Sequence, residues 1–261
     1  MKWSLLALAA AASAAALACT SRNEQKAAKM IDTGDVRKVT EAKQALDRVV
    51  ARHPQDAYAH FLLGQVYKRQ GMVDEAILEF EGVIELDDAN AEAYETLGAL
   101  YRKKGWNDRA ERALREAIRR NPSVPGAQNQ LGLLLLDVNR PQEAEAAFLA
   151  AVKLGRDLKW VYNNLGLAYL AEGRNPEATA VLERAVAEDQ RNAVAQNNLG
   201  VALERLGKRA EAIERYKLAV AIDPAYEKAG ANLRSLEDRM RRPAPKHRPS
   251  RAGSLRRPAV R

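Results

Sequence analysis

Residues 193–226 read AVAQNNLGVALERLGKRAEAIERYKLAVAIDPAY, and residues 159–192 read KWVYNNLGLAYLAEGRNPEATAVLERAVAEDQRN, with NNLG at the same place in both. Five glycines stand 34 residues apart, and an alanine follows each of them twelve residues later. The glycines are Gly64, Gly98, Gly132, Gly166 and Gly200, and the alanines are Ala76, Ala110, Ala144, Ala178 and Ala212. A period of 34 with a Leu-Gly pair is typical of stacked helix-turn-helix units. The sequence therefore predicts an all-α solenoid.

The length and motif content of the chain argue against an enzyme. Five repeats use most of the 261 residues, which leaves no room for a catalytic domain. The sequence has no phosphate-binding loop, nucleophile elbow or paired-acid arrangement. His53, His60 and His247 share no metal-ligand spacing, and His60 is expected to fill a packing position. We therefore expect no enzyme activity, no cofactor and no metal site.

The net charge of +8 is concentrated at the carboxyl end. Residues 241–261 carry eight Lys or Arg and no acid, so residues 1–240 are neutral overall. Because this segment also holds four prolines, it is predicted to be a disordered basic tail. Its expected partner is anionic lipid or cell wall, and the alternative is that it has no partner. Nucleic acid is not expected to bind an exported chain of this kind.

Residues 1–18 have the features of a bacterial signal peptide. The apolar run from Leu5 to Ala18 has 14 residues, fewer than the roughly 20 that a membrane-spanning helix needs. The ALAC sequence at 16–19 resembles the lipobox of bacterial lipoproteins, which implies a lipid on Cys19, the one cysteine of the chain. With Thr20 next, the expected location is the periplasmic face of the outer membrane. The alternative is ordinary secretion as a soluble periplasmic protein with a free thiol.

The segment after Cys19 is less regular than the repeats. Residues 19–37 are expected to form the lipidated end and a tether, with a worn first helix as the alternative over Ser21 to Asp35. Residues 38–56 keep the repeat pattern weakly and are predicted to hold a degenerate first repeat helix. Five repeats are expected over residues 57–224, with units at 57–90, 91–124, 125–158, 159–192 and 193–226. A capping helix is expected at 225–240, before the tail at 241–261.

The repeat pattern resembles that of tetratricopeptide (TPR) proteins. With places counted from residues 57, 91, 125, 159 and 193, the Leu-Gly pair fills places seven and eight. Place twenty-four holds a large residue throughout: Phe80, Leu114, Phe148, Leu182 and Tyr216. Small residues on both helices of a pair allow their backbones to approach closely. The resemblance implies a right-handed superhelix of about six helix pairs plus the capping helix.

Turn and cap residues support the same helix boundaries. Seven residues after each repeat glycine comes a residue that tolerates the left-handed conformation: Gly71, Gly105, Asn139, Gly173 and Gly207. Asp56, Asn90 and Asn192 precede first helices and are predicted N-caps. Pro125 and Pro224 are expected in the first turn of a helix.

The resemblance places a concave groove along the first helices, at places two, five, six, nine and twelve. There the later repeats carry amides and apolar residues: Asn129, Gln130, Leu133, Asn163, Asn164, Leu167, Leu170, Asn197, Asn198, Val201 and Asn232. An amide both donates and accepts hydrogen bonds, so this row is predicted to bind the backbone of an extended peptide. The alternative is that the asparagines only bridge neighbouring helices. The groove of the first two repeats carries mixed charges and two aromatic residues, which form either a separate contact or a solvated surface.

An exported, lipidated chain with about six such repeats resembles the pilotins, outer-membrane lipoproteins of type IV pilus biogenesis that promote secretin assembly. The resemblance covers residues 19–240 and rests on architecture. It implies a non-enzymatic scaffold that binds a protein or extended peptide, such as a secretin subunit, and reaches the membrane through its N-terminal lipid. The alternatives are a general periplasmic scaffold for other envelope machinery, such as gliding or cell-wall synthesis, and a holdase-like client binder.

Overall fold

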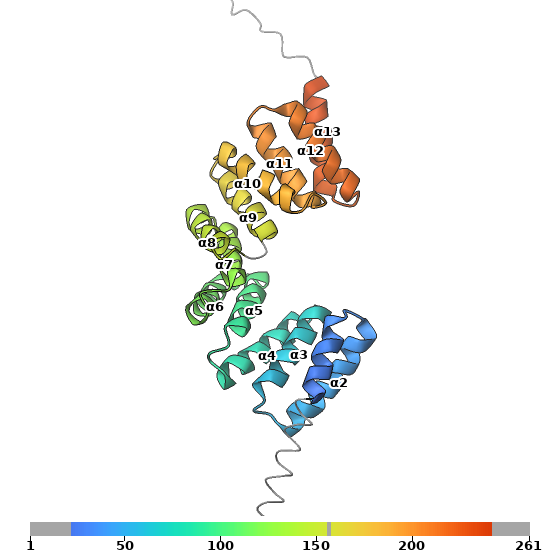
Figure 1. The fold of residues 1–261 in the computed structure, drawn as a ribbon, viewed down its shortest axis with the longest axis vertical. Helices are drawn as coiled ribbons and strands as arrows, with labels where there is room; N and C mark the ends of the chain where they lie inside the picture. Colours follow the sequence, from blue (N-terminus) through green and yellow to red (C-terminus); the bar gives the residue numbers. More distant parts are fainter. Residues whose placement is uncertain (1–21, 156–157, 242–261) are drawn as a thin grey trace, which may run out of the picture. The chain divides into compact units, whose positions relative to one another are not determined.

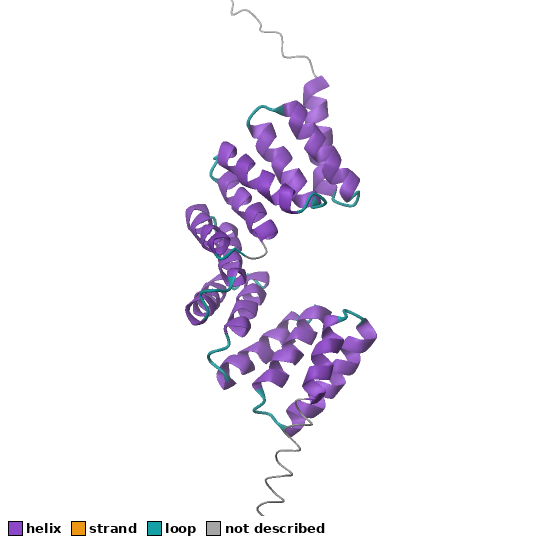
Figure 2. Ribbon diagram, in the orientation of Figure 1, coloured by secondary structure: helices purple, strands orange, loops and turns teal. Residues whose placement is uncertain are grey.

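The computed structural model describes residues 22–155 and 158–241, and within these ranges all regular secondary structure is helical (Figure 1, Figure 2). The prediction of an all-α chain is therefore confirmed. In the same ranges, no helix combines the length and apolar character that crossing a membrane requires. The predicted signal peptide, Cys19 and residues 242–261 of the predicted tail lie outside the described residues.

The helices follow one another as antiparallel pairs joined by short turns. The chain divides between Gln190 and Arg191 into two compact units, which are described separately below. The first unit contains a helix at 22–32 and then α2 (Val36–Arg52), α3 (Ala57–Gln70), α4 (Val73–Leu86), α5 (Ala91–Lys103), α6 (Asn107–Arg120), α7 (Pro125–Asp137), α8 (Pro141–Lys153), α9 (Leu158–Ala171) and α10 (Asn175–Glu188). The second contains α11 (Ala193–Arg205), α12 (Arg209–Ile222) and α13 (Glu227–Arg241).

The start of the first unit differs from the predicted tether and single helix. Residues 22–32 are helical, and Ala27 and Ile31 are buried against Ala42 and Leu46 of α2. The tether prediction is therefore wrong for residues 22–32, where the alternative of a worn first helix holds. The predicted lone helix at 38–56 is instead α2, the second helix of a complete pair.

Each repeat glycine lies against the large residue sixteen places later in its own repeat. A Cβ at Gly132 would come within 2.5–2.7 Å of three ring carbons of Phe148, and one at Gly64 within 2.9 Å of the Phe80 ring. The other three pairs are Gly98 with Leu114, Gly166 with Leu182 and Gly200 with Tyr216. All five large residues are at most 1% exposed. The glycine thus leaves room for the central side chain of each helix pair.

The observed turns and helix caps match those predicted from the sequence, with one exception. Gly71, Gly105, Gly173 and Gly207 have φ between 74° and 78°, and Asn139 has φ 58°. The Asp56, Asn90 and Asn192 side chains accept hydrogen bonds from backbone N–H groups in the first turns of α3, α5 and α11. Pro125 is the first residue of α7. Pro224 lies instead in the turn before α13, which begins at Glu227, so its predicted place in a helix is wrong.

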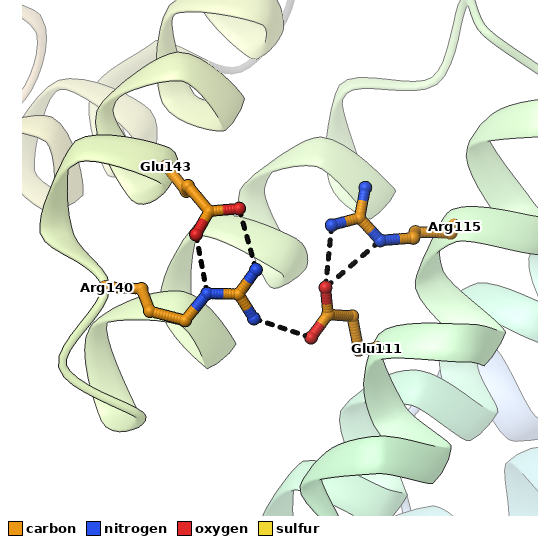
Figure 3. A network of polar contacts seen from close by, with 4 residues as sticks. All are labelled: Glu111, Arg115, Arg140 and Glu143. Atoms are coloured by element: carbon orange, nitrogen blue, oxygen red, sulfur yellow. Dashed lines mark hydrogen bonds and ion pairs between the residues drawn. The ribbon is translucent and has the colours of Figure 1, made fainter.

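Ion pairs connect the second helices of consecutive repeats. Arg140, at the start of α8, contacts Glu111 of α6 through Nη1 at 2.8 Å and Glu143 through Nε at 2.6 Å (Figure 3). The other oxygen of Glu111 accepts from Arg115 at 2.6 Å. Arg174 repeats this arrangement one repeat later, between Glu145 and Glu177. Because these groups are partly exposed, each pair contributes modestly, and their main effect is on how one repeat is set against the next.

Candidate protein-interaction surface

The predicted groove residues come from consecutive first helices. In the first unit α7 contacts α9, and in the second unit α11 contacts α13. Place five of one first helix faces place six of the next one, as the bonds described below show. The sequence therefore brings asparagines of neighbouring repeats within reach of one another.

In the first unit these asparagines are bonded to each other. Asn164 Nδ2 of α9 donates to Asn129 Oδ1 of α7 at 2.9 Å, and Asn163 Nδ2 donates to Asn164 Oδ1 at 3.3 Å. Asn163 and Asn164 are 4% and 9% exposed. This bond helps to fix the spacing of α7 and α9, because leaving the buried Asn164 amide without it would cost about 1–3 kcal/mol.

The second unit contains the same arrangement. Asn232 Nδ2 of α13 donates to Asn197 Oδ1 of α11 at 2.9 Å, and Asn197 Nδ2 donates to Asn198 Oδ1 at 3.2 Å. Asn197 is fully buried and Asn198 nearly so. Bridging of neighbouring helices, the alternative noted from the sequence, is therefore a role that these amides do have. Their role in binding a peptide remains a prediction.

The apolar members of the predicted groove are more accessible than the amides. Leu133, Leu167 and Val201 are half-buried, whereas Leu170 is buried. Gln130 is also half-buried, and its Oε1 is withdrawn from solvent without a hydrogen-bond partner. Trp160, at place two of the fourth repeat, is 51% exposed. The part of this surface that is open to a ligand is thus chiefly apolar.

The first helices of the first two repeats, α3 and α5, carry aromatic residues together with partly buried charged residues. Tyr58 stacks on Phe61 with ring centroids 6.5 Å apart and stays 48% exposed. Burial raises the pKa of Glu95, with a further rise from Glu92 and an opposing effect of Lys68. Burial in turn lowers the pKa of Lys68. The charges and aromatic residues at these places are evident from the sequence, but their desolvation depends on packing between repeats and could not be inferred from it.

The remaining candidates for chemistry have structural contacts. His60 Nδ1 lies 2.7 Å from Glu79 Oε2, and its Nε2 lies 3.2 Å from the carbonyl oxygen of Pro54, so the ring links α3 to α4 and to the preceding turn. Trp106 packs on Tyr101 across the turn between α5 and α6, with ring centroids 5.9 Å apart. Over the described residues, no three His, Cys, Asp or Glu side chains are grouped as metal ligands.

The helix pairs, their glycine contacts and their turns define a tetratricopeptide fold. A family model described as tetratricopeptide repeat matches residues 34–91, 96–158 and 163–227, and the chain belongs to this family. The family is typically a non-enzymatic scaffold that binds proteins or peptides. No curated protein matches the chain in sequence.

Solved structures with the same fold come from different settings. The APC/C hetero-tetramer Cut9–Hcn1 superposes with a TM-score of 0.70 at 20% identity, over 81% of this chain, which spans 43% of that one. PilF of Pseudomonas aeruginosa gives 0.68 at 18% identity, over 82% of this chain and 99% of PilF. PilW, described as a widely conserved type IV pilus biogenesis factor, gives 0.62 at 21% identity, over 70% and 91%. Because 365 solved chains match, these similarities show the fold alone.

Proposed function

We propose that the chain is a lipid-anchored scaffold at the periplasmic face of the bacterial outer membrane, which assists assembly of the type IV pilus secretin. The ALAC sequence at 16–19, following an apolar run, supports the anchor. The similarity of the fold to PilF and to PilW, a type IV pilus biogenesis factor, over nearly their whole lengths supports the pathway.

The observation that carries the binding role is the orphan acceptor on α7. Gln130 Oε1 is buried without a partner, and a buried acceptor left unpaired is costly unless something supplies a donor. Half-buried Leu133 lies three residues on, about one helical turn away on the same face, and Leu167 and exposed Trp160 are on α9. An extended segment supplies apolar side chains together with backbone N–H groups, and one of these can donate to Gln130 when that side chain turns outward, because its Oε1 is withdrawn from solvent in the free chain. The bound segment would thus lie across α7 and α9.

The binding role is tested by photo-crosslinking in cells. A photoreactive amino acid replaces Gln130 in the full chain, and a matched chain carries it at Leu149, which is 38% exposed on the second helix of the same repeat. We expect adducts with the secretin subunit from position 130 only, identified by mass spectrometry. Equal adducts from both positions would contradict the proposed site. A different envelope protein captured at 130 would support the site and assign the scaffold to other machinery.

The pathway and the anchor are tested separately. A deletion strain is expected to lose heat-stable secretin multimers on gels, and normal multimers would overturn the pilus role. Cys19→Ala is expected to move the chain from the outer-membrane fraction to the soluble periplasm, with Ser21→Ala as the control that stays in place. If the Cys19→Ala chain remains with the outer membrane, lipidation is not what holds it there.

A further inference from the structure

The second repeat breaks a pattern of ion pairs that the later repeats share. In repeats three to five, a basic residue at place sixteen pairs with a glutamate at place nineteen. These pairs are Arg140–Glu143 at 2.6 Å, Arg174–Glu177 at 3.0 Å and Lys208–Glu211 at 3.7 Å. The second repeat has Trp106 and Arg109 at the same places. The second repeat thus has an aromatic ring and a cation at the places where repeats three to five have an ion pair.

Trp106 is held in place and yet remains accessible. Its ring packs on Tyr101, and 40% of the residue is exposed. Arg109 lies over both rings, 4.7 Å from the Tyr101 centroid and 5.3 Å from that of Trp106. A fixed, exposed tryptophan next to arginine is a combination enriched at the centres of protein interfaces.

Two adjoining hollows open beside this ring, and they share Arg109 and Arg112. The smaller has a volume of about 180 Å³, with Ile84, Tyr94, Leu97 and Tyr101 among its lining residues. The larger, of about 550 Å³, runs from Gly105 past Trp106 to Arg112. Because a cavity of about 150 Å³ can hold benzene, the smaller hollow has room for one aromatic ring.

Arg112 differs from the other arginines of α6 because it has no acidic partner in the part of the chain that the structure describes. Arg115 contacts Glu111 (Figure 3), and Arg119 and Arg120 both contact Glu116, which also lines the smaller hollow. Arg109 pairs with Glu81 at 2.9 Å. Within the described residues no hydrogen bond or ion pair reaches Arg112.

Asp108 is the acid among the residues that line the larger hollow with Arg112. It belongs to the first turn of α6, where the helix dipole stabilises a carboxylate. Over its whole length α6 carries five arginines and three acids, so its surface is cationic.

We infer that the surface formed by Trp106, Arg109, Arg112 and the two hollows is a second docking site, which binds an acidic segment of a partner protein. An aromatic side chain of that segment fills the smaller hollow, and a neighbouring carboxylate pairs with the guanidinium of Arg112. Arginine suits this role because its planar group binds a carboxylate through two hydrogen bonds. The site lies on α5 and α6, with Ile84 of α4 at the smaller hollow, and does not depend on the proposed function of the α7 and α9 surface.

The test measures binding of a fluorescein-labelled peptide, Gly-Ser-Asp-Glu-Phe-Glu-Asp-Ser-Gly, to the full chain by anisotropy. We expect saturable binding that weakens as salt is raised, and at least a tenfold loss of affinity with Arg112→Glu. Arg119→Glu makes the same charge change on the same helix, outside both hollows, and is expected to stay within twofold of the original chain. Trp106→Ala is expected to weaken binding at least fivefold, with Leu149→Ala, at a similarly exposed apolar position on α8, as its control.

Several outcomes would overturn the inference. They are no binding of the acidic peptide at millimolar concentration, equal losses for Arg112→Glu and Arg119→Glu, or equal binding of a peptide with lysine in place of each acid. Circular dichroism of each variant checks that the chain is folded, so that a loss of binding can be assigned to the site and not to unfolding.

Discussion

At the scale of single residues, the fold depends on a contact between a glycine of the first helix and a large, buried side chain of the second helix. The glycine at place eight and the Phe, Leu or Tyr at place twenty-four meet in every one of the five repeats. This contact was predictable from the sequence as a close approach of two helices. The exact partner of each glycine was not, because it depends on the relative rotation of the two helices.

Gly132→Ala is expected to destabilise the chain by about 1–3 kcal/mol, because the added carbon would overlap the Phe148 ring. Gly82→Ala is the control, since a Cβ there meets only His60 Nδ1, at 4.0 Å, and sits within α4. Alanine in an open helix position is expected to stabilise by about 0.5–1 kcal/mol. The comparison is made by urea unfolding followed by circular dichroism, and effects of the same sign would contradict the packing argument.

Glu24 is a second residue whose titration affects stability, because the residue is only 7% exposed. Burial, together with Asp56, raises the pKa of Glu24 to about 7. The folded state thus favours the protonated carboxyl, so this contribution to stability is present below about pH 4.5 and is lost as pH rises through about 7.

Glu24→Gln should therefore raise the melting temperature at pH 8 and leave it nearly unchanged at pH 4.5. A neutral amide that donates to Asp56 is worth about 1 kcal/mol, or roughly 2–4 °C for a chain of this size. Glu41→Gln, on the exposed surface of α2, is the matched control. A gain of equal size at both pH values would show that Glu24 is not protonated by folding.

At the scale of helices, consecutive repeats are joined by a hydrogen bond between place six of one first helix and place five of the previous one. Asn164 with Asn129 and Asn232 with Asn197 have the same spacing of 35 residues and the same length, 2.9 Å. α7 contacts α9, and α11 contacts α13. The hydrogen bond adds a polar interaction to each contact, and its strength depends on the distance between the two helices.

A double-mutant cycle at Asn129 and Asn164 should measure this bond. Asn129→Ala is expected to cost about 1–3 kcal/mol, since it leaves the buried Asn164 amide without this partner, and Asn164→Ala is expected to cost a similar amount because it empties a buried position. The double substitution is expected to cost less than the sum, with a coupling of about 0.5–3 kcal/mol. Urea denaturation supplies the four free energies, and strict additivity would mean that the amides do not stabilise each other.

The helix boundaries and the groove residues were predictable to different degrees. Caps such as Asn90 and left-handed turn residues such as Asn139 act locally, so their residue types point directly to their conformations. The direction of the amides was not predictable, because Asn129 and Asn164 meet only when two helices are packed. The helix at 22–32 was only the alternative to a tether, because it carries Met30 in place of the repeat glycine, and its turn residue Gly34, with φ 68°, precedes Gly71 by 37 residues rather than 34.

At the scale of the whole molecule, the charge is divided between a neutral repeat array and a cationic end. Residues 242–261 carry seven of the eight net charges, and they lie outside the described residues. The positive charge of the chain therefore belongs mainly to residues 242–261, and we propose that they attract anionic lipid.

Removal of residues 242–261 is expected to abolish sedimentation with vesicles that contain phosphatidylglycerol. Each lysine or arginine near an anionic bilayer contributes about 1 kcal/mol, and the effect is screened by salt. Neutral phosphatidylcholine vesicles serve as the control surface, and circular dichroism checks that the truncated chain keeps its helices. Unchanged sedimentation of the truncated chain would mean that the repeats themselves hold the vesicles.

The glycine contact also bears on how such a chain changes length during evolution. Each glycine meets a side chain of its own repeat, so a duplicated stretch of 34 residues carries both halves of its packing with it. The fourth and fifth repeats have asparagine at both place five and place six. A duplicated copy of either repeat therefore carries one amide that can hydrogen-bond to the previous repeat and one that can hydrogen-bond to the next. A gene for this chain can therefore gain a repeat by unequal crossing-over without any compensating substitution in the protein core.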